Sequence, residues 1–479
     1  MMLPVWTLAL AGLLGFAPPS DTPAPIDPVP HDGSAAVGPG EPAQPAVAAQ
    51  PAQPAPPAQP AQPAQPAQPV QPAQPVQPAQ PGVAGAPAQP AAAPKQPADA
   101  VPESGSRLSV EYKPNTGVHI TSADGRFAMA TWLRMQLRDT LTHTPSATPE
   151  LTNGMEFRRA SLFFAGNVFG PNNKYFLQLV FDPRGLGMQN GQVTQSPLFD
   201  FFFTFDYLRD LSVRVGQYKP QYSRQFIAAW ADLQFVDRST VQSEFLLERD
   251  LGFDLFSNDL GGLDLFRYSL GLYMGQGRNN LAINDMRMDY VARLEVLPFG
   301  GFDEYVEADL DRRRKPKLAL GVAYSFSDHA QQDRGVRGAT PADGGTTNIH
   351  QFVADTMFKV RGFSATGEFF WRRGVRNPGS AVDDMGVAIP VSAPRNGIGW
   401  FGQAGYLLPR APVEFVARGG QTIAMGNTSM GSIGELGGGL GWYLQGHAMK
   451  LQMDYFHTWA NAGFADGGNQ VRLQLQIGI

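Results

Sequence analysis

The chain has 479 residues, with 37 basic and 42 acidic side chains, and only 16% of its residues are charged. It contains no cysteine, which excludes disulfides and thiolate metal sites. The mean hydropathy of −0.21 argues against a helical membrane protein, while 53 glycines and 31 phenylalanines favour short strands and turns. Residues 106–479 hold equal numbers of acids and bases, so bulk charge indicates no nucleic-acid partner.

The first 17 residues read MMLPVWTLALAGLLGFA, an apolar stretch that is too short to cross a bilayer as a helix. Gly15 and Ala17 are small enough for the two positions that determine signal-peptide cleavage. We therefore expect a cleaved export signal over residues 1–17. A buried helix that is not cleaved is the alternative.

Residues 18–105 consist mainly of Pro, Ala and Gln, with PAQ and PVQ repeated from residue 42 onward. Such a segment has almost no apolar surface to bury and cannot offset the entropy lost on ordering. Its prolines favour an extended polyproline-II conformation. We expect a disordered periplasmic spacer, either an inert linker or a tether that contacts the cell wall.

From residue 106 onward the apolar residues recur with the period of strands, without a convincing helical run. We count sixteen alternating segments, each near the length that a tilted strand needs to cross a bilayer. Connections after odd-numbered segments are mostly long, and those after even-numbered segments are mostly short, as in outer-membrane barrels. The expected strands are 126–138, 156–168, 173–182, 198–208, 211–218, 250–257, 264–275, 287–297, 317–327, 350–361, 362–372, 398–408, 412–421, 434–445, 447–459 and 468–479.

The predicted fold is all-β: a transmembrane antiparallel β-barrel of about 16 strands over residues 106–479, in contact with outer-membrane lipid. In the segment 198–208, alternate aromatic residues from Phe199 to Tyr207 should face lipid, while Asp200 and Asp206 should face a water-filled lumen. A secreted two-sheet sandwich is the soluble alternative. Some apolar side chains fall on the expected lumen side: Phe163, Phe176, Val180 and Phe202.

No motif for catalysis, a metal or a cofactor is recognisable. The histidines lack metal-ligand spacing, and neither a GxSxG elbow nor a phosphate-binding GxxxxGK[ST] loop is present. An outer-membrane enzyme is therefore the least favoured class of function.

The alternation also projects a set of basic side chains into the lumen. Arginine outnumbers lysine 29 to 8, and its planar fork suits phosphate or carboxylate oxygens. These arginines either guide anions or pair with inward-facing acids as an internal scaffold. The lumen candidates are Arg134, Arg138, Arg159, Arg214, Arg267, Arg293, Arg361, Arg372 and Arg418, with Lys174, Lys359, Lys450 and Arg472 projected alongside them.

The longest early loop, residues 219–249, is unusually apolar for a segment in water, with Phe226, Trp230 and Phe235 among its residues. We expect it to fold into the barrel and narrow the pore, where a low-dielectric channel focuses the field of charged groups. A surface loop that makes subunit contacts is the alternative. Its basic residues are the constriction candidates: Lys219, Arg224, Arg238 and Arg249. The cluster DRRRKPK at 311–317, on the short-turn rim, is expected to be a solvated basic patch.

Several segments resemble the phosphate-selective porin O and P family, among them EFRRASLFFAGNVFGPNNKYFLQLVFD, VRVGQYKPQYSRQF, KPKLALGVAYSF and GWFGQAGYLL. The resemblance spans about 126–479 and is most specific between GQYKP and ERDLG. It implies a sixteen-stranded outer-membrane porin, usually a homotrimer, whose third long loop folds inward and whose basic lumen residues conduct phosphate-like anions. The four constriction candidates lie within matching segments.

The sequence thus predicts a porin for passive diffusion of small solutes that favours phosphate or other anions. The alternative is a general-diffusion or envelope-tethering barrel without anion specificity.

Overall fold

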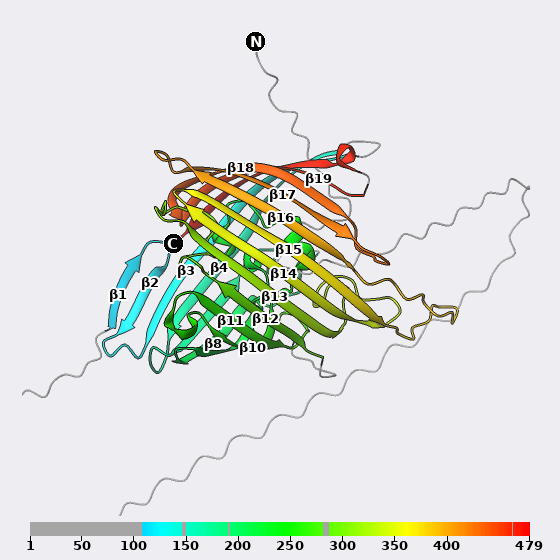
Figure 1. Cartoon of the computed structure of the whole chain (residues 1–479), viewed down its shortest axis with the longest axis horizontal. Coiled ribbons are helices and arrows are strands. Elements are labelled where there is room, and N and C mark those ends of the chain that lie inside the picture. Colours follow the sequence, from blue (N-terminus) through cyan, green and yellow to red (C-terminus); the bar gives the residue numbers. More distant parts are fainter. Residues whose placement is uncertain (1–107, 146–149, 190–191, 281–286, 462) are drawn as a thin grey trace, which may run out of the picture. The chain divides into compact units, whose positions relative to one another are not determined.

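The computed structural model describes residues 108–145, 150–189, 192–280, 287–461 and 463–479. The expected export signal and spacer lie outside the described residues. Within the described part, sixteen antiparallel strands follow one another around a barrel, which closes where the last strand pairs with the first (Figure 1). The strands are β3 (Ala128–Thr144), β4 (Glu150–Asn167), β5 (Asn173–Val180), β8 (Leu198–Leu208), β9 (Leu211–Tyr218), β10 (Asp250–Ser257), β11 (Phe266–Tyr273), β12 (Asp289–Val296), β13 (Lys317–Ala330), β14 (Thr346–Val360), β15 (Phe363–Asn377), β16 (Gly397–Leu407), β17 (Val413–Ala424), β18 (Ile433–His447), β19 (Met449–Trp459) and β20 (Gly468–Gly478).

The predicted all-β barrel is confirmed, and three strands, β8, β9 and β10, have the expected bounds. The first two barrel strands differ from the expectation. β3 ends at Thr144 and not at residue 138, and β4 begins at Glu150 and not at residue 156, so the connection between them is much shorter. Their extra residues pair across the hairpin from Arg138–Glu156 to Thr144–Glu150. These residues are largely polar, so hydrophobic alternation does not reveal them.

A hairpin that the sequence pattern does not indicate precedes the barrel. It consists of β1 (Leu108–Lys113) and β2 (Gly117–Ser122). β2 pairs with β3 from Ala128 to Thr131, next to the point where Ile479 bonds to Leu133. The hairpin therefore pairs with the part of β3 that lies beyond the end of β20, at the short-turn rim and close to the C-terminus (Figure 1).

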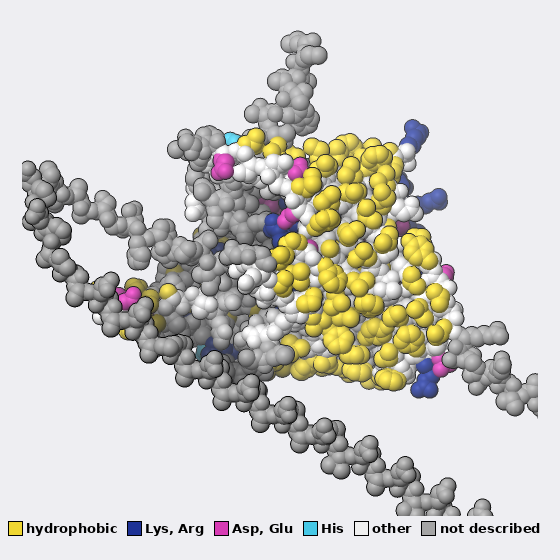
Figure 2. All heavy atoms as spheres, turned by 180° about the vertical axis from the view of Figure 1, so that it is seen from behind, with side chains coloured by type: hydrophobic (Ala, Val, Ile, Leu, Met, Phe, Trp, Pro, Cys, Tyr) yellow, Lys and Arg dark blue, Asp and Glu magenta, His cyan; other side chains and the backbone are white. Residues whose placement is uncertain are grey.

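The outer wall is apolar and the inner wall is polar. Along β12 to β19 buried and more exposed residues alternate, and outward side chains such as Trp400, Phe415 and, on β11, Leu270 are 45–53% exposed. Hydrophobic side chains cover the visible wall, and charged ones gather at its margins (Figure 2). Such a wall suits hydrocarbon, where unpaired backbone groups are costly and closure of the sheet satisfies them. Among the described residues, no helix is both long and apolar enough to cross a membrane.

Two strand irregularities change which side chains enter the lumen. On β4, Gln136 pairs with Arg159 and Leu137 with Phe157, so Arg158 is an extra residue and is buried beside Arg159. On β8, Gln178 pairs with Asp200 and Leu179 with Leu198, so Phe199 is extra. The prediction that Phe199 faces lipid was wrong, because this bulge turns it inward, where it is 3% exposed.

Candidate functional site

The loop between β9 and β10 folds into the barrel, as expected. Its apolar side chains are buried, with Phe226, Trp230, Phe235 and Phe245 each 5% exposed or less. It contains two short helices, α1 (Arg224–Ile227) and α2 (Thr240–Phe245), and a 3-10 turn, Trp230–Asp232. Burying these rings against the wall stabilises the inward position.

Two serines begin the helices of this loop and also bind the wall. Ser223 accepts a hydrogen bond from the backbone of Phe226 and donates one to Glu368 on β15 at 2.6 Å. Ser239 repeats the arrangement, accepting from Val241 and donating to Glu435 on β18 at 2.6 Å. Each serine therefore both caps the N-terminus of its helix and binds that helix to a strand of the wall.

Charged pairs hold the same loop. Arg224 contacts Glu295 at 2.7 Å and Asp355 at 2.8 Å, on β12 and β14. At the other end of the loop, Glu244 of α2 binds Arg372 of β15 and Arg395. Buried pairs are costly to break because each partner is left as an uncompensated charge. These contacts tie the loop to the half of the wall formed by β12 to β20.

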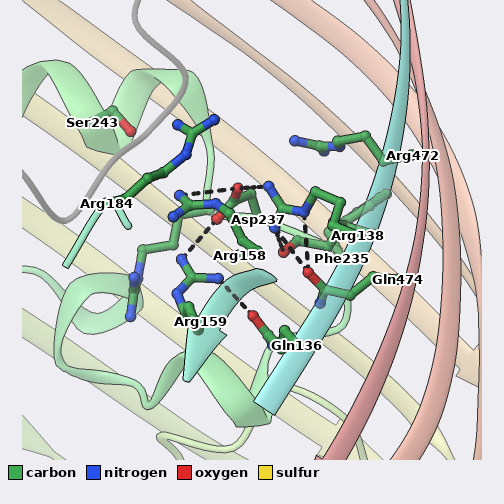
Figure 3. A network of polar contacts seen from close by, with 12 residues as sticks. Gln136, Arg138, Arg158, Arg159, Arg184, Phe235, Asp237, Ser243, Arg472 and Gln474 are labelled. Atoms are coloured by element: carbon green, nitrogen blue, oxygen red, sulfur yellow. Dashed lines mark hydrogen bonds and ion pairs between the residues drawn. The ribbon is translucent and has the colours of Figure 1, made fainter. Parts of the chain in front are cut away.

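The most concentrated charge lies at Asp237. Its carboxylate contacts Arg138 at 2.6 Å, Arg159 at 2.9 Å and Arg158 at 3.5 Å (Figure 3). Burial alone would raise the pKa of Asp237, but these guanidinium groups outweigh it and hold the pKa well below its ordinary value of 3.8. The bulge on β4 makes this arrangement, because it lets neighbouring arginines face the same carboxylate.

The turn between β12 and β13 also enters the lumen, from the opposite rim. Glu307 accepts hydrogen bonds from the Gln234 backbone at 2.7 Å and from Gln403 at 2.8 Å, so this turn meets the inserted loop inside the barrel. Lys359 donates to the carbonyl of Asp303 at 2.9 Å. Of the basic patch expected in this turn, Arg314 and its neighbour Lys315 are exposed, whereas the flanking basic residues are half-buried.

The other half of the wall, β3 to β5 and β8 to β12, retains open space. Cavities among the described residues there include ones of about 190, 300 and 10 Å³, which we call the short-turn, central and long-loop cavities. The short-turn cavity includes Ser257 and Asn258 at the end of β10, and the long-loop cavity includes Asp182 and Arg184 after β5. The central cavity shares Arg214 with the short-turn cavity and Trp230 with the long-loop cavity, so the three form a row in which neighbours share lining residues.

Basic side chains predominate along this path. In the described lining, the acidic residues are Asp182, Asp200 and Glu295. Several acids that pair with the arginines lie behind them: Asp254 binds Arg214 at 2.5 Å and does not line the cavities. The basic lining residues are Arg134, Arg158, Arg159, Arg184, Arg214, Lys219, Arg249, Arg267 and Arg293.

The four constriction candidates separate into two pairs. Lys219 and Arg249 line the central cavity. Arg249 also contacts Asp200 at 2.9 Å, and Lys219 donates to the Phe226 carbonyl at 2.7 Å. Arg224 forms the wall contacts described above, and Arg238 donates to the Gln225 and Ala228 carbonyls within the loop. A role in anion contact stays a prediction for all of them.

The lumen candidates separate in the same way. Arg372 and Arg418 hold the loop, and Arg418 contacts Glu435 at 3.1 Å. Arg138 binds Asp237, and the remaining wall arginines except one line the cavities. The exception is Arg361, whose lumen placement was wrong. It is exposed in the turn between β14 and β15, where Arg361 and Gly362 have φ of 52° and 88°, because a tight hairpin needs two turn residues.

Sequence reasoning missed three features of the site. Arg158 and Phe199 enter the lumen through bulges that alternation does not predict. Room for the loop comes partly from glycines on the inner face of β16: a Cβ at Gly399 would lie 2.5 Å from the Phe245 ring. The repeated glycines of this strand were a visible signal for close approach of another segment.

No protein-family model matches the chain, and no curated protein matches it. Among solved structures, it is similar to a loop L8 deletion mutant of OmpT, an outer membrane protein of Vibrio cholerae (10% identity over 73% of this chain and 99% of that chain, TM-score 0.48). It is also similar to an anion-selective porin from Comamonas acidovorans (12%, 73% and 100%, 0.46) and to the outer membrane channel DcaP of Acinetobacter baumannii (10%, 75% and 99%, 0.46). Values this low carry no argument about function, so the family and the solute remain predictions.

Proposed function

We propose that this protein is an outer-membrane porin through which small anions, phosphate among them, diffuse passively along the three adjoining cavities. The observation that carries the proposal is the excess of basic over acidic side chains in the described lining. Because several of their carboxylate partners lie behind them, the groups nearest a solute are mainly positive. A narrow low-dielectric channel strengthens such a field.

Passive conduction also requires that no single contact hold the anion tightly. The lining arginines meet this requirement, because they already bind protein carboxylates, such as Asp254 for Arg214 and Asp355 for Arg293. A passing phosphate therefore competes for guanidinium donors and leaves again. A solute would be handed from one cavity to the next.

The remaining parts of the proposal rest on the sequence. We infer that residues 1–17 direct export, that residues 18–105 form a periplasmic spacer with access to the cell wall, and that the barrel forms a homotrimer, as the family resemblance implies. Light scattering of the detergent-solubilised protein tests the trimer. A monomeric mass would refute it.

Planar-bilayer recording of the purified full chain tests the channel. Under a potassium chloride gradient, the reversal potential should report preference for chloride, and added phosphate should reduce the chloride current. Lys219→Gln should weaken both effects, whereas Arg314→Gln, in the exposed turn, should leave them unchanged. Preference for potassium would overturn anion selectivity, and a chloride-selective current insensitive to phosphate would overturn the phosphate assignment. A non-selective current would favour a general-diffusion barrel.

A further inference from the structure

An arc of aromatic rings lines the inner wall beside the central cavity. The rings come from β3, β4, β5, β8 and β9, which pair in that order, and from β11, which β10 separates from β9. Successive ring centroids lie 5.0 to 6.1 Å apart. The aromatic arc consists of Trp132, Phe163, Phe176, Phe202, Tyr218 and Tyr273. Spacings of this size are typical of stacked and edge-to-face contacts.

Packing of the inserted loop explains only part of the arc. Phe163 is buried against Trp230 and Ala231, and Tyr218 and Tyr273 are buried in the cluster that includes Phe245. The other members, Trp132, Phe176 and Phe202, pack against the edges of these clusters but stay half-buried and line the central cavity. Apolar rings facing a polar lumen are unfavourable without an apolar occupant, because leaving them in water forfeits the free energy of burial.

The rest of the cavity lining is cationic. Lys219, Arg249 and Arg134 line the same space, with Asp200 as the acidic residue of its described lining. Arg214 lies 4.2 Å from the Tyr218 ring centroid and 5.4 Å from that of Phe202, so positive charge also borders the rings. One side of the cavity therefore offers aromatic faces, and another side offers donors for an oxyanion.

We propose that the central cavity binds a small aromatic carboxylate, a single ring bearing one carboxylate, as it passes through the channel. This inference rests on the proposed function and narrows the class of anion. The ring packs on the half-buried members of the aromatic arc, and the carboxylate accepts hydrogen bonds from the basic lining. A volume of about 300 Å³ suits one such molecule, and a mostly apolar pocket with a few polar groups is typical of small-molecule sites.

The test compares benzoate with cyclohexanecarboxylate, which has the same charge and similar size but no aromatic ring. Equilibrium binding to the detergent-solubilised full chain is followed by intrinsic tryptophan fluorescence, so the readout does not depend on conductance. Ring–ring contact predicts that benzoate binds about 2- to 10-fold more tightly. Equal affinity for the two, or no binding of benzoate, would overturn the inference.

Adjacent rings on β8 supply a matched pair of variants. Phe202→Leu should reduce the preference for benzoate, whereas Phe203→Leu, on the outward face, should leave it unchanged. A preference as large in Phe202→Leu as in the wild type would overturn the placement on the arc. The wild-type comparison remains decisive if either variant fails to assemble.

Bilayer recording separates this inference from the proposed function. Chloride selectivity together with equal affinity for the two acids would leave the anion channel intact and remove the aromatic site. Tighter binding of benzoate with no anion-selective current would keep the site and overturn the channel.

Discussion

Protonation of Glu244 should loosen α2, the part of the inserted loop that this residue holds against the wall. This carboxylate lies on α2, is 5% exposed, and accepts two hydrogen bonds of 2.9 Å from Arg395 in addition to its contact with Arg372. Burial alone would raise its pKa, but Arg372 and Arg395 outweigh that effect and lower the pKa from 4.5 to about 2. The charged form is therefore favoured when the loop is docked.

The size of the effect follows from the pKa difference. A fall of this size corresponds to about 3 kcal/mol of stabilisation of the docked loop, at 1.36 kcal/mol for each pH unit. Because the docked pKa is depressed, the stabilisation is fully present above pH 4.5 and is lost as the pH falls toward 2. The ratio of docked to released loop would therefore fall more than 100-fold between pH 4.5 and pH 2.

Single-channel recording from pH 7 to pH 2 checks this prediction. The wild type should conduct steadily above pH 4.5 and should show growing current fluctuations below it. Glu244→Gln should fluctuate already at neutral pH, and the step between pH 4.5 and 2 should shrink. Asp466→Asn, at an exposed carboxylate, serves as the control. An unchanged acid transition in Glu244→Gln would refute the assigned role of this carboxylate.

Other variants test the geometry directly. Gly399→Leu should displace α2 and enlarge the conductance, because Phe245 occupies the space of the new side chain, whereas Gly402→Leu, whose Cβ would meet open space, should not. Leu270→Arg, on the outward face, should destabilise the barrel by about 2–4 kcal/mol if it lies near the bilayer midplane, as measured by urea titration in lipid vesicles. Arg361→Ala should leave the reversal potential unchanged, since Arg361 lies in an exposed turn; a shift would place it in the conduction path.

The barrel was predictable because the alternation of apolar and polar residues that defines its two faces recurs in strand after strand. An apolar outer face and a polar inner face impose a period of two, and β8, β9 and β10 have the bounds that this period indicates. Hydrophobic alternation gives no signal where a strand has no apolar outer face. The polar extensions of β3 and β4 and the hairpin of β1 and β2 are held by backbone pairing, which leaves little trace in the sequence.

The candidate site was predictable only as a set of residue types. Alternation placed most arginines inside, but the lumen position of Arg158 depends on a bulge, and bulges shift one residue without a reliable local signature. Pairing partners were also hidden, because Asp237 meets Arg138 across 99 positions of sequence. Contacts of this kind follow from how the loop folds back, which strand periodicity does not encode.

Scaffolding and anion guidance were posed as alternatives for the inner arginines, but the geometry allows one residue to serve both. A guanidinium has five N–H donors, so Arg214 can bind Asp254 through Nε and Nη2 and present Nη1 to the cavities that it lines. What separates the two roles is the position of the acid. Where the carboxylate lies behind the arginine, as with Asp254 and Arg214, positive charge faces the solute; where it belongs to the inserted loop, as with Asp237, the pair fixes the constriction. The same ionic chemistry can therefore build the pore wall and set its selectivity.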